Sequence, residues 1–208
     1  MRADPEVLAD RLVGLAAARP RVLVGIAGAP GAGKSTLAVA VGAALVARAV
    51  PVAVVPMDGF HLADVALDAL GRRAAKGAVD TFDGAGYAAL LARVVEGGET
   101  VWAPAFDREI EQPIAGSIEV PPESRVVITE GNYLLLPEEP WARIRPLLAE
   151  AWYLDIDTAL RYSRLVERHV RFGKSRATAE AWVRDVDEPN AARIAPTAAR
   201  ADLVLRAE

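Results

Sequence analysis

Residues 28–36 read GAPGAGKST, and this stretch decides the fold. It matches G-x-x-x-x-G-K-[ST] in full through Gly28, Ala29, Pro30, Gly31, Ala32, Gly33, Lys34 and Ser35, with Thr36 next. The apolar, β-branched run before it, RVLVGIA at 21–27, predicts a strand buried on both faces. A helix is predicted to open at Lys34, so its positive end faces the glycine-rich turn.

The residue types in this turn suit an anionic phosphate. Glycines let main-chain N–H groups point inward around the anion. Lys34 is expected to reach the β- and γ-phosphates of a nucleotide, and the Ser35 hydroxyl to ligate Mg²⁺. A glycine-rich turn that only links strand to helix would not need a lysine beside the helix start. We therefore predict a phosphate-binding loop.

The pattern around the loop predicts an α/β fold. Further strands are predicted at 52–56, 100–106, 125–130, 152–155 and 202–205. Helices are predicted from Pro5 to before Pro20 and at 37–49, 62–70, 87–96, after Pro140, at 157–172 and at 178–186, with loops at 71–84 and from 107 to 117. Such alternation predicts a parallel sheet covered on both sides, within a single domain spanning 1–208.

Composition excludes several classes of function. The 208 residues contain no cysteine, which excludes disulfides, thiolate zinc sites and cysteine nucleophiles. A net charge of -4 does not favour a nucleic-acid partner. The longest apolar stretch, 37–57, is interrupted by Arg48, Pro51 and Pro56, so we expect a buried helix and strand and no membrane span. We expect a cytoplasmic protein with a small-molecule substrate, and leave open whether it forms a homodimer.

Two acidic residues follow predicted strands where the carboxyl ends of the sheet would face the phosphate loop. Asp58 could accept the proton of an attacking hydroxyl, but aspartate at a helix start is also a common cap. Glu130 ends the run VVITE, and an acid there is costly unless charge or metal meets it. We assign Glu130 to Mg²⁺ or its water shell, the alternative being a carboxylate simply solvated at the strand end.

Four arginines recur on one face of the helix predicted at 157–172: Arg161, Arg164, Arg168 and Arg171. Like charges at this spacing oppose helix formation, so the stripe indicates an anionic partner such as the transferred phosphate. Asp157 and Glu167 could instead pair with some of them. We expect two of the four to contact nucleotide. Gly173 breaks the helix afterwards, which would let this segment close as a lid.

We expect the molecule that accepts the phosphate to be bound by polar residues that are scattered along the sequence. The loop from Arg72 to Asp83 is too polar for core, which is typical of a substrate-binding loop. The candidate contacts to the acceptor are His61, Lys76, Asp83, Tyr87, Arg108 and Asn132.

With these motifs in hand, the chain from about Arg21 onward resembles the uridine kinase, pantothenate kinase and phosphoribulokinase group of P-loop kinases. It is most similar in pattern to the bacterial nucleoside/nucleotide kinase-like branch. Beyond the phosphate loop, the resemblance is carried by DGFH at 58–61, EGNYLLL at 130–136 and IAPT at 194–197. Ala74 and Ala75 stand where the family pattern is more basic, so the resemblance names no substrate.

The resemblance implies a three-layer P-loop NTPase fold with a central, mostly parallel sheet and a small helical lid at about 164–180. It implies ATP and Mg²⁺ as cofactors and Asp58 as catalytic base, with Lys34, Glu130, Arg164 and Arg168 in the phosphate site. The predicted function is transfer of the γ-phosphate to a hydroxyl of a nucleoside, a pantothenate-like compound or a sugar. A nucleotide-hydrolysing switch and a regulatory nucleotide-binding module remain as alternatives.

Overall fold

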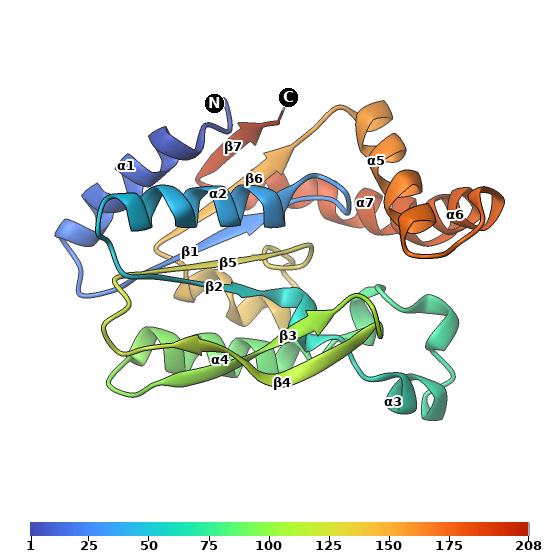
Figure 1. The fold of residues 1–208 in the computed structure, drawn as a ribbon, viewed down its shortest axis with the longest axis horizontal. Helices are drawn as coiled ribbons and strands as arrows, with labels where there is room; N and C mark the ends of the chain where they lie inside the picture. Colours follow the sequence, from blue (N-terminus) through green and yellow to red (C-terminus); the bar gives the residue numbers. More distant parts are fainter. Residues whose placement is uncertain (208) are drawn as a thin grey trace.

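The computed structural model describes residues 1–207, and its centre is a five-stranded parallel sheet in the order β2-β5-β1-β6-β7 (Figure 1). The strands are β1 (Val22–Ala27), β2 (Val52–Pro56), β5 (Val126–Gly131), β6 (Glu150–Asp155) and β7 (Leu203–Arg206). All five were predicted from the sequence within two residues at either end. The three-layer α/β class is thereby confirmed.

Side chains of the sheet alternate between two apolar cores. Val22, Val24 and Ile26 of β1 pack towards α1 (Pro5–Ala17) and α2 (Lys34–Ala47), which cover one face. Leu23 and Ala27 pack on the other face, where α4 (Gly84–Glu96) lies. Strands that are apolar on both sides require cover on both sides, and this accounts for the three layers.

The prediction at the region after 100 was wrong in two respects. β3 (Val101–Asp107) does not join the central sheet but pairs in antiparallel fashion with β4 (Gln112–Val120), which we had predicted as loop up to residue 117. Pro113 and Gly116 read as loop residues, and most of β4 is exposed. Proline is tolerated at a sheet edge, where its missing N–H costs nothing. The hairpin lies over α4, on the side of the sheet away from α1 and α2 (Figure 1).

Some helical segments match the predictions, and others differ in length or in helix type. α3 (Asp64–Ala69) is shorter than predicted, and the helix predicted after Pro140 is two 3-10 turns, Trp141–Arg143 and Arg145–Leu147. α5 (Thr158–Arg171) matches, with Asp157 as its N-cap. α6 (Arg176–Trp182) continues through a π-helical turn, Val183–Asp187, into α7 (Glu188–Ile194) and a 3-10 turn, Ala195–Arg200, which the sequence analysis had not assigned.

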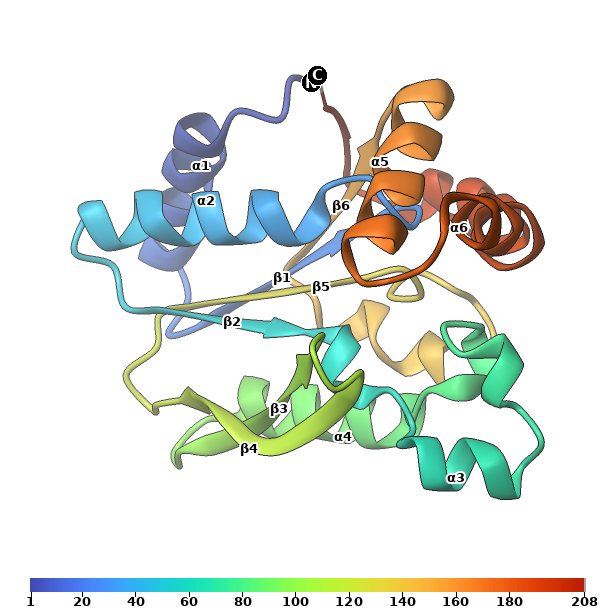
Figure 2. The same cartoon turned by 45° about the vertical axis from the view of Figure 1, so that its right-hand side comes forward.

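The two chain ends lie side by side in both views (Figures 1 and 2). The Ala3 N–H donates to the Arg206 carbonyl at 3.0 Å, and the Arg206 N–H donates to the Met1 carbonyl at 2.8 Å. The first residues therefore extend the sheet beside β7. Within residues 1–207, no helix has the length and apolar character needed to cross a membrane.

The strand order decides where the site can form. β5 lies between β1 and β2, and Glu130 is in register with Ile26 on one side and Pro56 on the other. The segments that leave these strands, with the phosphate loop after β1 and Asp58 after β2, therefore meet at one edge of the sheet. This is where α/β sheets bind their ligands.

Candidate active site

The phosphate loop has a backbone that only glycines fit. Gly31 and Gly33 have φ values of 78° and 93°, in the left-handed region. A Cβ on Gly31 would lie 2.7 Å from Cγ of Leu165, and one on Gly28 would lie 2.7 Å from the main-chain oxygen of Leu154. The loop therefore packs closely against α5 and β6, and α2 begins directly after it at Lys34.

Lys34 is buried at the base of this loop, with 7% of its surface exposed. Its Nζ donates to the Ala29 carbonyl at 3.0 Å and to Oδ1 of Asn132 at 2.7 Å. Burial lowers the pKa of Lys34 to about 8, although Glu130 and Asp58 oppose this shift. Asn132, a predicted site residue, thus orients the ammonium group at the loop.

Ser35 and Glu130 form an oxygen pair beside Lys34. The Ser35 hydroxyl donates to Oε1 of Glu130 at 2.9 Å, and Glu130 is 5% exposed. Burial raises the pKa of Glu130, and the nearby charge of Asp58 adds to this. Because Glu130 is buried and bonded, the alternative of a carboxylate simply solvated at a strand end does not hold.

Asp58 lies in the 3-10 turn Met57–Phe60, directly after β2, and its carboxylate faces a cation. Nη2 of Arg108 donates to Oδ2 of Asp58 at 2.6 Å. Burial acts to raise the pKa of Asp58, but electrostatic attraction from His61 in its protonated form, from Arg108 and from Lys34 outweighs it, so this pKa lies below the usual carboxyl range. Among residues 1–207 no main-chain N–H donates to this carboxylate, which removes the capping alternative.

The four arginines of α5 lie in different surroundings. Arg164 and Arg168 line the cleft, and that two of the four arginines contact nucleotide stays a prediction. Arg161 is buried and pairs with Glu188 of α7 at 2.5 Å, so neither Asp157 nor Glu167 is its partner. Arg171 is exposed and lies outside the cleft lining. Burial lowers the pKa of Arg168, with the repulsion of Arg108 adding to it.

An aromatic wall lies beyond Asp58. The ring of His61 lies 3.9 Å from that of Phe82 and 4.6 Å from that of Phe106, measured between centroids. Nδ1 of His61 lies 2.8 Å from the Asp58 carbonyl, and a carbonyl only accepts, so Nδ1 is the donor. Nζ of Lys76 donates to Asp64 at 2.7 Å and lies over the Phe106 ring.

These groups line one cavity of about 1090 Å³. It holds the phosphate loop, Glu130 and Asp58, and it contains four of the predicted acceptor contacts: His61, Lys76, Arg108 and Asn132. Such a volume is large enough for a nucleotide and a second small molecule together.

Two predicted acceptor contacts lie elsewhere. Asp83 caps α4, where Oδ1 accepts from the Gly86 N–H at 2.8 Å, and it is exposed outside the cavity lining. Tyr87 is fully buried, and its hydroxyl bonds to that of Thr129 beneath the sheet edge. Both positions follow from ordinary roles, helix capping and core packing, and the geometry does not support either as a substrate contact.

The sequence analysis also missed residues that line the cavity: Phe106, Glu111, His169, Asp187 and Asn190. Phe106 and Glu111 belong to the hairpin whose second strand was read as loop. Nε2 of His169 lies 2.9 Å from Oδ2 of Asp187, and Nδ2 of Asn190 donates to the Gly77 carbonyl at 3.2 Å. The polar segment DEPN at 187–190, which contains Asp187 and Asn190, was a usable signal in the sequence.

The protein supplies some, but not all, of the oxygen ligands that a hard cation needs at the loop. In the portion of the chain that the structure describes, no group of three or more His, Cys, Asp or Glu side chains could hold a metal ion. Ser35 and Glu130 supply two oxygen donors, and Mg²⁺ commonly takes one or two protein oxygens together with phosphate and water. The residues present therefore fit a nucleotide-borne Mg²⁺ rather than a metal held by protein alone.

Comparisons with known proteins agree with this geometry. The model of the phosphoribulokinase/uridine kinase family matches residues 23–207. A crystal structure described as a "putative fructose transport system kinase" from Silicibacter sp. TM1040 superposes with a TM-score of 0.87 and 38% identity, over 97% of this chain and 98% of that one.

Relatives by sequence point the same way. The "putative uridine kinase C227.14" of Schizosaccharomyces pombe is 37% identical over 80% of this chain and 74% of that protein. The uncharacterised protein YggC of Escherichia coli is 33% identical over 89% of this chain and 77% of that protein. From the family match and the phosphate site together, we conclude that the chain belongs to the phosphoribulokinase/uridine kinase family and is an ATP-dependent kinase that phosphorylates a hydroxyl group.

Proposed function

We propose that the protein transfers the γ-phosphate of Mg·ATP directly to a hydroxyl of a small, uncharged polyhydroxy molecule, with Asp58 as the base. The observation that carries this is the placement of Asp58 in the same cavity as Lys34 and Ser35. The lowered pKa of Asp58 keeps it ionised at neutral pH, so it can accept the proton of the attacking hydroxyl.

Positive charge around the loop supports phosphate binding. Lys34 approaches the phosphates from the loop, and Arg164 and Arg168 approach from α5. Among residues 1–207 no carboxylate lies within ion-pairing distance of Arg168, although burial disfavours its charge. A γ-phosphate would supply the missing counter-charge, and guanidinium groups stabilise the charge of the transition state in phosphoryl transfer.

Ser35 and Glu130 are the residues that would hold Mg²⁺. When bound, the ion neutralises phosphate charge and helps orient the transferred group. Glu130 is buried beside Ser35, so a cation at the loop would meet its carboxylate away from bulk water and would favour its ionised form. Asn132 accepts from the Lys34 ammonium, which also donates to the Ala29 carbonyl of the loop.

The acceptor end of the cavity favours an uncharged molecule. Lys76 pairs with Asp64, Arg73 pairs with both Asp64 and Asp68, and Arg108 pairs with Asp58, so each cation is matched by a carboxylate. The aromatic wall of His61, Phe82 and Phe106 can pack against a sugar ring or a base, and Nε2 of His61 is left to accept from a hydroxyl. Of the three predicted classes, this favours a nucleoside or a sugar over a pantothenate-like carboxylate.

Residues 164–180 are proposed to act as a lid within a single domain. Arg164 and Arg168 reach the cavity from α5, and Lys174 and Trp182 line it from beyond the helix end. Gly173 ends α5 with a φ of 94°, a conformation that β-carbon-bearing residues rarely adopt. A rotation there would move the residues that follow α5, Lys174 among them, relative to the phosphate loop.

A screen of acceptors tests the proposed function. ADP release from ATP would be measured with nucleosides, sugars and pantothenate as acceptors. We expect a nucleoside or a sugar to stimulate ADP release well above the background hydrolysis, because the acceptor end is internally neutralised. Stimulation by pantothenate alone would contradict the substrate class, and ADP release that no hydroxyl compound stimulates would contradict the kinase assignment.

Substituting Asp58 tests the base. Asp58→Asn should lower kcat by about 10²- to 10⁴-fold, because the amide cannot take a proton, while the Kd for ATP stays unchanged. Asp10→Asn is the matched control, since Asp10 is exposed and pairs with Arg48, and both residues lie outside the cavity lining. A near-normal kcat for Asp58→Asn would show that another group accepts the proton.

The pKa of Lys34, about 8, predicts a pH dependence of nucleotide binding. The ammonium is mostly charged at pH 7 and roughly nine-tenths neutral at pH 9. Since only the charged form attracts phosphate, the Kd for ATP should rise about tenfold from pH 7 to pH 9. Calorimetry would measure it, with Lys34→Met expected to bind weakly and without this rise. A wild-type Kd that is constant over the range would contradict the assignment of Lys34.

A further inference from the structure

The cavity continues past the phosphate loop, away from Asp58, as far as the two chain ends. There it is lined by Ala3, Pro5, Ala40 and Ala207. Ala3 and Pro5 precede residue 23, where the family match begins, so the family pattern predicts no role for them. All four are half-buried, with a face open to the cavity.

The orientation of a bound nucleotide follows from the proposed function, on which this inference rests. The γ-phosphate must face Asp58, and the loop and Thr36 at the start of α2 hold the phosphate chain. The nucleoside then extends in the opposite direction. Along α2 that direction leads from Thr36 to Ala40, one turn further on, and so to the chain ends.

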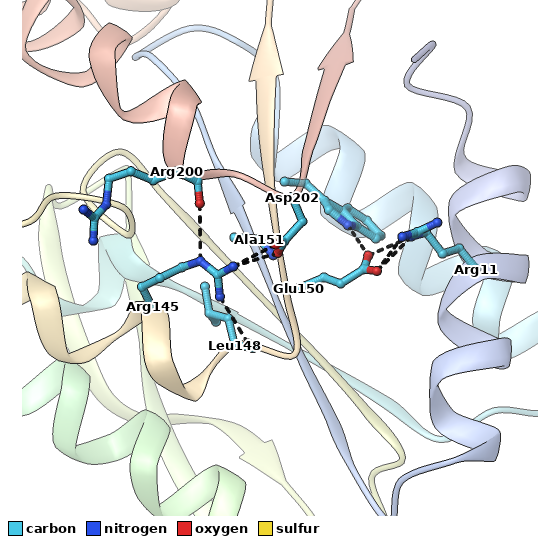
Figure 3. A network of polar contacts seen from close by, with 8 residues as sticks. Arg11, Arg145, Leu148, Glu150, Ala151, Arg200 and Asp202 are labelled. Carbon is cyan, nitrogen blue, oxygen red and sulfur yellow. Dashed lines mark hydrogen bonds and ion pairs between the residues drawn. The ribbon is translucent and has the colours of Figure 1, made fainter.

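Hydrogen bonds and ion pairs hold this end of the cavity in place. The first residues pair with β7 through Ala3 and Arg206, and Ala207 donates to the Asp155 carbonyl at 2.9 Å. Figure 3 shows how the neighbouring elements are fixed: Arg11 of α1 donates to both carboxylate oxygens of Glu150, at 2.8 and 2.6 Å. The N-terminal segment therefore has a fixed position, because it pairs with β7 and leads into α1, which is bonded to β6.

The start of β7 is fixed by a second cluster in the same view. Asp202 accepts from Arg145 at 2.8 Å and from the Ala151 N–H at 2.7 Å (Figure 3). Both clusters lie away from the phosphate loop and outside the cavity lining. Their common effect is to fix β7, with Ala207 beyond its end, relative to β6.

We propose that Ala3 and Pro5 of the N-terminal segment, together with Ala40 and Ala207, form the binding site for the base of the nucleotide. The side chains of alanine and proline have no hydrogen-bonding groups, so they recognise a flat base by packing. Binding energy at this end then depends on the space between small side chains. The ligand of this site is the purine base of ATP, and contacts with the N-terminal segment determine the affinity for ATP.

Larger side chains in this space test the proposal. Ala3→Phe and Ala40→Phe should each raise the Kd for Mg·ATP at least about tenfold, because the added ring occupies the volume of the base. The Kd for inorganic tripolyphosphate, which has no base, should stay within about twofold of wild type in both variants. Calorimetry would measure both ligands, with circular dichroism to confirm folding.

Val39→Phe is the matched control, since Val39 precedes Ala40 on α2, is 65% exposed and lies outside the cavity lining. It should bind both ligands as wild type does. Unchanged ATP binding in the folded Ala3 and Ala40 variants would overturn the inference, and so would an equal loss for tripolyphosphate. A wild-type chain that binds neither ligand would overturn the proposed function itself, and the two failures are thus distinguishable.

Discussion

The structure depends on charge brought together at the carboxyl edge of three parallel strands. Lys34 and Glu130 are buried there and Asp58 is half-buried, and each charge is costly to remove from water unless a neighbour compensates it. Asn132, Ser35 and Arg108 supply those neighbours. Arg168 is the exception, because it adds positive charge without an ion-pair partner among residues 1–207. The phosphate of a nucleotide is the group that would complete this arrangement.

Each layer of the fold contributes to that edge. The central strands fix the phosphate loop, Glu130 and Asp58 through their register, and these positions are set by the backbone. The hairpin brings Arg108 to Asp58, and α5 brings Arg168 to the loop. The N-terminal residues Ala3 and Pro5 extend the same cavity beyond the residues that the family model matches. A kinase needs its base, phosphates and acceptor in one water-poor space, and here distant segments enclose it.

The parts predicted from the sequence are those with local causes. The phosphate loop needs glycines at fixed positions, and buried strands need unbroken β-branched runs, so both were visible. Pairings between distant segments were not. Arg108 meets Asp58 only because β3 and β4 form a hairpin, whose second strand read as loop at Pro113 and Gly116. Asp83 and Tyr87 were predicted to contact the acceptor because they are polar residues close in sequence to the predicted substrate-binding loop. In the structure Asp83 caps α4 and Tyr87 packs in the core.

The central claim is that Arg168 carries a positive charge without an ion-pair partner among residues 1–207, and that a bound phosphate supplies that partner. A substitution of Arg168 tests this claim most directly. The free energy of unfolding would be measured for wild type, Arg168→Met and the control Arg171→Met, with and without Mg·ATP. The account predicts that Arg168→Met is at least as stable as wild type without nucleotide but gains much less stability from Mg·ATP, while Arg171→Met behaves as wild type. Lower stability of Arg168→Met without nucleotide, together with a wild-type gain from Mg·ATP, would contradict it.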